Sequence, residues 1–564
     1  EQTGIKGWDG LFWKNQYEAF QLFFHEKNLA PYFGSIDSLT RAMGDVSFDH
    51  QGRRIQGMRM QNTGDVYAVN GWEAMPYDNH SGIVDIYRNC KGNPSTFTYY
   101  TQPLYVAVSP RTQFVHLPGK VPVDFYIVNE KNLSGKYRLS VSVCTPDGKE
   151  GKHIEKEVHI TGGDCFGQLL LENCHLEIEG ASGLYQVKAQ LRNASGHLCA
   201  EGKDEVLGIY WDEKQLKGKG ALHGTPDDPV ATFYQKATGS ELPAFRSDME
   251  KLDWIVVTRS SLDAPQPVPV EAFCQKEGKS VLELSLYKDD DLRALAGVTQ
   301  DNKIDRTFAD GAQPDPLLPA NQSFSAIWDG KLKAPQSGTY MIGVTSDQGM
   351  RLSVNGQRIV DEWRNNKELT VVRPFLLKAG DEVAVRVEYS QRNPTGSVQL
   401  VWSLPDHAAI APQELLDRVR EDGTSLLLLK SAESWMDAVS AYTGSAYHGY
   451  YSVGKNWVGG VHFVKEHPLF NGLPVNVAMG WPYQTLVRNG DRRLGLHIDN
   501  EELVAGSYGS APFNLGSAVG IISCGKGKIY YSTLDLVDNL NNPAAAADVA
   551  RKLFCNFILL SKDK

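Results

Sequence analysis

Cysteine and histidine are common nucleophiles and metal ligands, but neither shows a catalytic or metal-binding pattern in this 564-residue chain. The eight cysteines lie far apart and include no C-x-x-C pair, so the sequence predicts neither a zinc site nor a dense disulfide framework. Four histidines in the last quarter of the chain lack metal-ligand spacing and a neighbouring nucleophile: His448, His462, His467 and His497. We therefore expect these histidines to be structural, and we expect no catalytic residue or metal centre among them.

One stretch near the N-terminus combines aromatic, acidic and amide side chains after a short apolar run. Trp72 and Glu73 directly follow the expected strand 66–70, and Asn79 and His80 lie in the polar loop beyond it. An apolar ring face beside hydrogen-bonding groups is the combination that orients a small polar ligand in a pocket. The ordinary alternatives are a Trp72 ring that fills a core and a His80 ring that bonds only the backbone.

A second stretch places an acid and an amide in a turn. Asp347, Gln348 and Gly349 follow an alternating apolar run, so Asp347 either caps this turn or contacts a ligand. A hard cation such as calcium prefers several carboxylate oxygens. Because the second position is the neutral amide of Gln348, the sequence favours a site without calcium, and we expect no cofactor.

The elements around this turn are expected to be strands. Apolar and polar residues alternate in five runs between positions 324 and 402, which places the apolar side chains of each run on one face of a half-buried strand. Ser337-Gly338 and Asn355-Gly356 supply turns, and the second pair is a strong hairpin signal. Five such strands predict an antiparallel β-sandwich.

These residues resemble a PA14 domain, which we place at 278–404. The shared motifs run from Trp328 to Tyr340 (G-x-L-x-A-P-x-S-G-x-Y), from Ser346 to Gly356, and from Asp361 to Trp363. Many members of this family bind carbohydrate, and some hold calcium with an Asp-Asp pair. The resemblance implies that Asp347, Gln348 and Trp363 contact carbohydrate.

The first 110 residues resemble the end of the catalytic barrel of glycoside hydrolase family 2, the β-galactosidase group. The shared motifs are HQGRRIQ at 50–56, NGWE at 70–73, DNHSGIVD at 78–85 and YYTQPLYVA at 99–107. The resemblance implies retaining hydrolysis by two carboxyl groups, about 5–5.5 Å apart, at strand ends of a (β/α)₈ barrel. It places both carboxyl groups upstream of this chain, which is then expected to be inactive alone. Trp72, Glu73, Asn79 and His80 would form one wall of the sugar pocket.

The remaining chain divides into two further expected domains. Residues 111–235 contain about seven short alternating runs with regular turns, which predicts an immunoglobulin-like β-sandwich. Residues 241–277 and 405–564 alternate buried apolar strands with helices, which predicts a doubly wound α/β domain interrupted by the PA14-like module. The motif at 467–474 resembles the class I glutamine-amidotransferase fold. The turn after Leu429 has no cysteine, so we expect no amidotransfer.

The expected fold is therefore multidomain, α/β plus all-β, with the end of a (β/α)₈ barrel at 1–110. The expected function is that of the C-terminal portion of a retaining exo-acting β-glycosidase, with accessory carbohydrate-binding domains. The alternative is a non-catalytic carbohydrate-binding or adhesion protein built on a barrel remnant and a PA14 module.

Charge and hydropathy limit the partners of the chain. A net charge of −10 and a pI near 5.8 argue against a nucleic-acid partner. No apolar run approaches the ~18 residues of a membrane span. We expect a polysaccharide or oligosaccharide partner and, from the resemblance, a periplasmic or secreted bacterial protein. The rest of the barrel, or a partner chain, is expected to cover the apolar face of the helix at 12–29.

Overall fold

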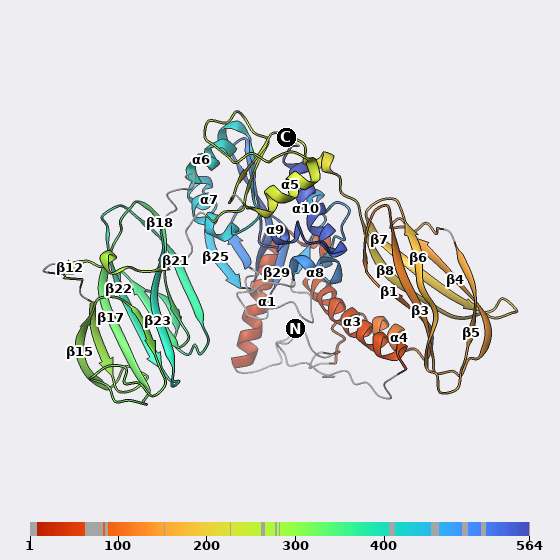
Figure 1. Ribbon diagram of the computed structural model, residues 1–564, viewed down its shortest axis with the longest axis horizontal. Coiled ribbons are helices and arrows are strands. Elements are labelled where there is room, and N and C mark those ends of the chain that lie inside the picture. Colours follow the sequence, from red (N-terminus) through yellow and green to blue (C-terminus); the bar gives the residue numbers. More distant parts are fainter. Residues whose placement is uncertain are drawn as a thin grey trace. The chain divides into compact units, whose positions relative to one another are not determined.

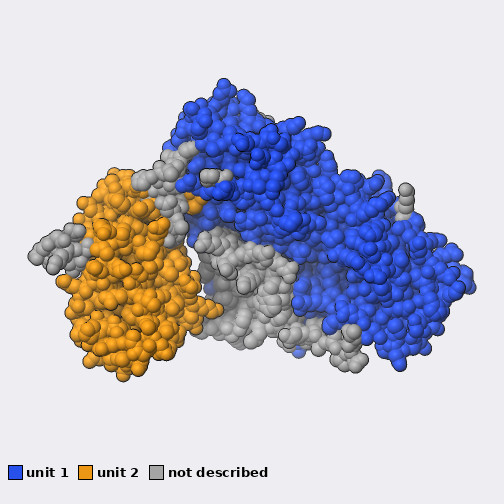
Figure 2. All heavy atoms as spheres, viewed as in Figure 1, with its two compact units in different colours: residues 1–259, 411–564 blue, residues 260–410 orange. Residues whose placement is uncertain are grey.

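The computed structural model describes residues 8–62, 83–84, 88–151, 153–225, 227–260, 266–276, 279–280, 282–404, 412–452, 462–487, 494–508 and 515–562. The chain forms two compact units (Figure 2). The first contains Glu1–Arg259 and Ala411–Lys564, and the second contains Ser260–Ile410.

The first unit begins with helices that pack on its α/β sheet. They are α1 (Trp8–Glu26), α2 (Ala30–Phe33) and α3 (Ile36–Met60), with α4 (Pro94–Thr101) further on (Figure 1). The side chain of Ser35 caps α3 by accepting a hydrogen bond from the Ser38 backbone N–H at 3.1 Å. We expected the rest of a barrel, or a partner chain, to cover the apolar face of the first helix. For Phe20 and Phe24 this expectation is wrong. Both rings are buried in a cluster that includes Phe463 and Leu503 of the sheet, so the unit covers them itself.

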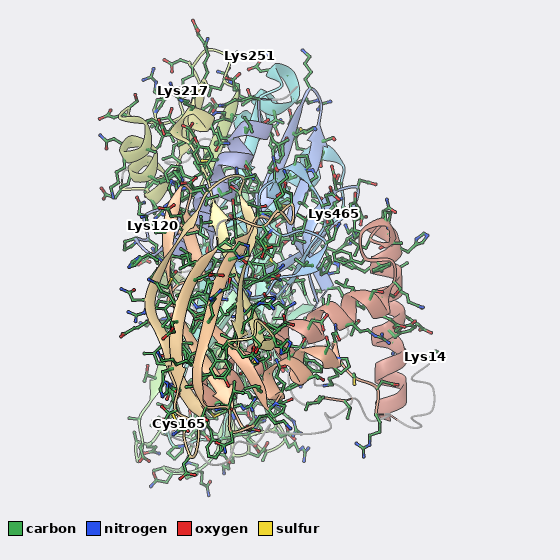
Figure 3. All side chains as sticks on the ribbon, turned by 90° about the vertical axis from the view of Figure 1, so that its right-hand side faces the viewer. Lys14, Lys120, Cys165, Lys217, Lys251 and Lys465 are labelled. Atoms are coloured by element: carbon green, nitrogen blue, oxygen red, sulfur yellow. The ribbon has the colours of Figure 1, made fainter. Side chains whose placement is uncertain are left out.

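A β-sandwich follows the helices. One sheet has the order β1-β3-β6 and the other β2-β8-β7-β4-β5. Val121, Val123, Phe125 and Ile127 alternate along β3 and point into the core between the sheets. Lys120 and Cys165 lie toward opposite ends of this sandwich (Figure 3). The strands are β1 (Leu104–Pro110), β2 (Phe114–His116), β3 (Gly119–Asn129), β4 (Gly135–Cys144), β5 (Ile154–Ile160), β6 (Gly167–Ile178), β7 (Gly183–Arg192) and β8 (Leu198–Ile209).

The α/β part is built on a mixed sheet of order β27-β26-β29-β30-β31-β24-β10-β9. The strands β9 (Gly220–His223), β10 (Trp254–Val257), β24 (Ser425–Leu428) and β31 (Gly527–Ser532) are parallel. The continuous apolar runs at β10 and β24 predict this arrangement. β9 lies within 111–235, the range expected for the β-sandwich, but it pairs with β10 in this sheet. The remaining strands pair antiparallel, so the sheet differs from the all-parallel sheet of a doubly wound fold. They are β25 (Tyr447–Ser452), β26 (His462–Val464), β27 (Val477–Ala478), β28 (Leu494–Ile498), β29 (Glu502–Tyr508) and β30 (Leu515–Cys524).

Helices cover this sheet. Val549, Leu553 and Phe557 of the C-terminal helix lie in the same core as Val256 of β10 and Leu427 of β24. The helices are α5 (Pro229–Thr238), α6 (Pro412–Asp417), α7 (Met436–Thr443), α8 (Gln484–Val487), α9 (Leu536–Asn539) and α10 (Asp548–Leu560). No helix in the described part of the chain is long and apolar enough to span a membrane. The eight cysteines all fall within the described ranges, and all are free thiols.

The second unit is an antiparallel β-sandwich with its own core. One sheet has the order β15-β14-β17-β22-β19-β20, and in the other β23 and β18 are central. The alternating runs at 324–402 are confirmed as strands. The strands are β11 (Gln266–Pro267), β12 (Gln275–Lys276), β13 (Lys279–Ser280), β14 (Leu282–Tyr287), β15 (Leu295–Asp301), β16 (Asp305–Phe308), β17 (Phe324–Lys333), β18 (Gly338–Ser346), β19 (Gly349–Val354), β20 (Gln357–Glu362), β21 (Leu369–Leu377), β22 (Glu382–Gln391) and β23 (Gly396–Ser403).

Candidate functional site

The N-terminal site residues lie outside the described residues. Trp72, Glu73, Asn79 and His80 are among them, so their role as a sugar-pocket wall stays a prediction. The neighbouring motif at 50–56 is described, and it makes packing contacts. Arg53 of α3 forms an ion pair with Asp204 of β8 at 2.8 Å, and the Gln56 amide donates to the Val108 carbonyl oxygen at 3.2 Å. These contacts join α3 to the β-sandwich.

In the second unit, Gln348 joins two loops at one end of the sandwich. Its side chain is 3% exposed. Nε2 donates to the Thr395 carbonyl oxygen at 3.1 Å, while Oε1 accepts from the backbone N–H groups of Arg392 at 3.2 Å and Asn393 at 3.4 Å. The amide therefore uses both donor and acceptor to hold the loop between β22 and β23.

Asp347 bonds to the strand beside it rather than to its own turn. Its Oδ1 accepts from the backbone N–H of Ser397 at 2.6 Å and from the Ser397 hydroxyl at 3.2 Å. Ser397 lies near the start of β23, so the carboxylate fixes the other end of the loop that Gln348 holds. Within the described residues, no group of three or more histidine, cysteine or acidic side chains is placed to hold a metal ion.

Trp363 reaches the same loop through Arg392. The indole Nε1 donates to Asp291 Oδ1 at 3.1 Å, and the Arg351 guanidinium lies 4.3 Å from the ring centroid. Arg392 Nη1 donates to the Trp363 carbonyl oxygen at 2.7 Å, while the Arg392 backbone bonds Gln348. The structure thus brings Gln348 and Trp363 together around Arg392, with a guanidinium against the Trp363 ring.

A pocket of about 450 Å³ lies beside this loop, within the same unit. Segments 306–314, 321–324 and 391–394 line it. Its volume is within the range of small-molecule sites, about 300–1,000 Å³. Asp347, Gln348 and Trp363 do not line this pocket, but Gln348 holds the backbone of Arg392 and Asn393, which do.

Two aromatic residues, Phe308 and Phe324, form part of the apolar wall of the pocket. The half-buried ring of Phe308 stacks on Tyr389, with centroids 5.5 Å apart and planes 24° apart. It also packs edge-on against Phe324, with centroids 5.0 Å apart. Phe308 and Phe324 are both lining residues, and the stack on Tyr389 fixes the orientation of the Phe308 ring.

Five of the ten polar residues that line the pocket carry side-chain amides. The amide groups of Asn321, Gln322 and Asn393 make no hydrogen bond to any described part of the chain. Gln391 is buried, and its Oε1 accepts from the Tyr389 hydroxyl at 2.7 Å. Burial and the nearby Asp347 carboxylate raise the pKa of Tyr389, so its hydroxyl stays a donor. Sequence periodicity did not indicate these residues; the amide-rich loops at 321–323 and 391–393 were the available signal.

Comparisons with known proteins assign one segment of this chain to a domain family. A family model described as the PA14 domain matches residues 278–415. A curated relative, the anti-sigma-I factor RsgI3 of Acetivibrio thermocellus, is 29% identical over 117 residues. That match covers 21% of this chain and 18% of the relative, so the chain spans less than a fifth of the relative's length.

Solved structures with similarity to this chain include a β-glucosidase from Kluyveromyces marxianus, with a TM-score of 0.22 and 17% identity. The match covers 36% of this chain and 25% of the β-glucosidase. An anti-sigma factor domain-containing protein from Clostridium clariflavum has a TM-score of 0.21 and 15% identity, over 53% of this chain and 93% of that one. The PA14 domain of the MpAFP antifreeze protein has a TM-score of 0.19 and 14% identity, over 24% of this chain and 89% of that one. By the family match, this chain contains a PA14 domain, which its second compact unit carries.

Proposed function

We propose that the PA14 domain binds a glycan in the pocket formed by segments 306–314, 321–324 and 391–394. The observation that carries this proposal is the presence in one lining of Phe308 and three side-chain amides, Asn321, Gln322 and Asn393, that make no hydrogen bond to the described residues. A sugar ring has an apolar C–H face and hydroxyl groups that both donate and accept. An aromatic wall and amide groups complement both features.

Binding in this pocket is proposed to need no calcium. The Gln348 amide already connects the turn after β18 to the loop after β22, and one oxygen of the neighbouring Asp347 carboxylate accepts from Ser397. A bridging cation would need several oxygen ligands at this position. We expect equal glycan affinity in the presence of calcium and of a chelator.

Glycan-array screening and titration calorimetry of the chain test this proposal. We expect Asn393→Ala to weaken binding about tenfold, which corresponds to about 1.4 kcal/mol. Gln357→Ala is the matched control, because this exposed amide of β20 does not line the pocket. Asp347→Ala tests the carboxylate that the sequence predicts to contact carbohydrate. Unchanged binding by this variant would show that Asp347 is not part of the site. The absence of any glycan ligand would overturn the proposal.

We propose further that this domain serves a retaining exo-acting β-glycosidase, whose catalytic carboxyl groups lie upstream of this chain. The motifs at 50–56, 70–73, 78–85 and 99–107 support this reading. Trp72, Glu73, Asn79 and His80 would complete the sugar pocket of an exported bacterial enzyme, with the upstream barrel segment as their structural partner.

Hydrolysis of an aryl β-galactoside tests the enzymatic part. This chain alone is expected to show no turnover, and a longer product that includes the upstream barrel is expected to be active. Trp72→Ala in that longer product should lower kcat/KM. Glycan binding without any hydrolysis by the longer product would favour the alternative, a carbohydrate-binding or adhesion protein.

A further inference from the structure

We infer that the pocket of the PA14 domain selects uncharged sugars over acidic ones, an inference that rests on the proposed glycan binding. Two arginines, Arg306 and Arg392, are among the residues that line the pocket. Arginine in a sugar pocket would ordinarily favour a uronic acid or a sulfated sugar, because its N–H groups bind carboxylate and sulfate oxygens. In this domain, the guanidinium groups of both arginines are already bound by carboxylates of the same chain.

The Arg306 guanidinium is held by Asp301. Its Nε and Nη2 donate to Asp301 Oδ2 at 3.0 and 2.8 Å. The Asp301 side chain is 8% exposed, and the same oxygen accepts from Trp328 Nε1 at 3.1 Å. Because this carboxylate is buried and fixed by the indole, an acidic ligand would have to compete with a preformed partner.

The Arg392 guanidinium is held on two sides. Its Nε donates to Asp290 Oδ2 at 2.9 Å, and its Nη1 donates to the Trp363 carbonyl oxygen at 2.7 Å. The two bonds fix the direction of the group, and the Asp290 carboxylate balances its charge. A carboxylate arriving in the pocket therefore finds no unpaired arginine.

The other charged residue of the lining is Asp310, which is exposed and would repel an anion. The groups that remain for recognition are neutral. They include the amides of Asn321, Gln322 and Asn393, which can donate to and accept from sugar hydroxyls. A neutral hexose or N-acetylhexosamine matches this set, whereas a uronic acid does not.

The test measures, by titration calorimetry at low salt, the affinity of the chain for two oligosaccharides. The two differ at one sugar only, which is a neutral hexose in the first and the corresponding uronic acid in the second. The full chain is expected to bind the neutral oligosaccharide more tightly. Asp290→Asn removes the charge of the Arg392 partner, and we expect it to improve affinity for the acidic oligosaccharide about fivefold. Its affinity for the neutral oligosaccharide should change little, and the gain should disappear at high salt.

Asp329→Asn is the matched control. Asp329 pairs with Arg386 at 2.8 Å, and the side chains of this pair are about as exposed as those of Asp290 and Arg392, but neither residue lines the pocket. We expect this variant to behave like the unaltered chain. Asp301→Asn, which frees Arg306 instead, provides a second test if Asp290→Asn unfolds the domain.

Tighter binding of the acidic oligosaccharide by the unaltered chain would overturn the neutral preference while leaving glycan binding intact. Equal responses of Asp290→Asn and Asp329→Asn would overturn the role of the ion pair at Arg392. Binding of neither oligosaccharide, together with an empty glycan array, would overturn the proposed function as well.

Discussion

Gln348 shows how one neutral side chain can fix the loop between β22 and β23. Its amide contacts the backbone on both sides of the loop that carries Asn393 into the pocket. A pair of carboxylates at this position would repel each other unless a cation lay between them. The neutral amide instead connects the loops by hydrogen bonds alone.

Replacing Gln348 with alanine should therefore loosen the pocket. The backbone N–H groups of Arg392 and Asn393 and the carbonyl oxygen of Thr395 would lose their buried partner. We expect the free energy of unfolding of the PA14 domain to fall by about 2 kcal/mol, and glycan affinity to fall with it. Urea denaturation with Gln357→Ala as the reference would measure this; equal stability of the two variants would contradict the loop-fixing role.

His497 gives the first unit a specific pH dependence. Burial, with smaller contributions from Lys27 and His448, lowers the pKa of His497 from 6.5 to about 4. Between these two values the unfolded chain binds a proton that the folded chain does not. Stability should therefore fall as the pH drops through this window, by at most about 3 kcal/mol.

Replacing His497 with glutamine should flatten this part of the pH profile. Urea midpoints of the first unit at pH 7 and pH 4.5 would be compared for the two proteins. Other groups titrate in the same window, so the informative quantity is the difference between the proteins. A variant that loses as much stability on acidification as the unaltered chain would exclude His497 as the source.

The site residues could be predicted only in part from the sequence. The turn chemistry of Asp347 and Gln348 identified the loop end of the PA14 domain, and the structure connects Gln348 and Trp363 through Arg392. The pocket amides Asn321 and Asn393 were not predicted, because loop contacts follow no periodicity and depend on how distant segments meet.

At the scale of elements, a buried ion pair ties α1 to the α/β sheet. Its cation, Lys27, is the residue directly after the last residue of α1. Lys27 Nζ lies 2.6 Å from Glu501 Oε1, and the Glu501 side chain is 0% exposed. Glu501 also accepts hydrogen bonds from the hydroxyls of Ser517 and Tyr531. The cluster therefore joins the N-terminal helices to two central strands, β30 and β31.

Lys27→Met should destabilise the first unit by about 3 kcal/mol, because it leaves a buried carboxylate without its cation. Burial raises the pKa of Glu501, and removal of the Lys27 cation should raise it further, so the loss of stability should grow as pH rises and the carboxyl group ionises. Combining Lys27→Met with Glu501→Gln should cost less than the sum of the single changes. Additive losses in urea denaturation would contradict direct coupling of the pair.

Strong periodicity decided which elements could be predicted. The alternating runs at β17, β18, β22 and β23 gave correct strands because their alternate apolar side chains, such as Ala326, Val387 and Leu400, all lie in one core. By contrast, β15 exposes Leu295 and Val298 and buries none of its side chains fully, so its run lacks the signal of a half-buried strand. In the α/β sheet, the turn at Gly525-Lys526-Gly527 predicts the antiparallel pair β30–β31, and the structure has it. The other antiparallel strands were missed because a buried apolar run does not reveal the direction of its neighbours.

At the scale of the molecule, the PA14 domain is an insertion between two neighbouring strands. β10 ends at Val257 and β24 begins at Ser425, and the two pair in parallel within the first unit. The buried core of the second unit draws all its residues from between Val268 and Trp402. Each unit completes its own core, so the two sequence patterns do not mix. The insertion could therefore be predicted from an α/β pattern that stops and resumes, with a continuous run of sandwich strands between its two parts.

Removing the insertion should leave the first unit intact. Replacing 260–410 with a flexible Gly/Ser linker of about 12 residues keeps β10 beside β24, since their register Trp254↔Ser425 depends only on residues of that unit. We expect the thermal transition of the first unit to shift by less than about 1 °C, which corresponds to less than about 1 kcal/mol for a unit of this size. The isolated 260–410 segment should fold and bind glycan as tightly as the full chain, because every lining residue of its pocket lies between Arg306 and Pro394. Aggregation of the linked first unit would show that the insertion contributes to its fold, and loss of glycan binding by the isolated segment would place part of the site outside the PA14 domain.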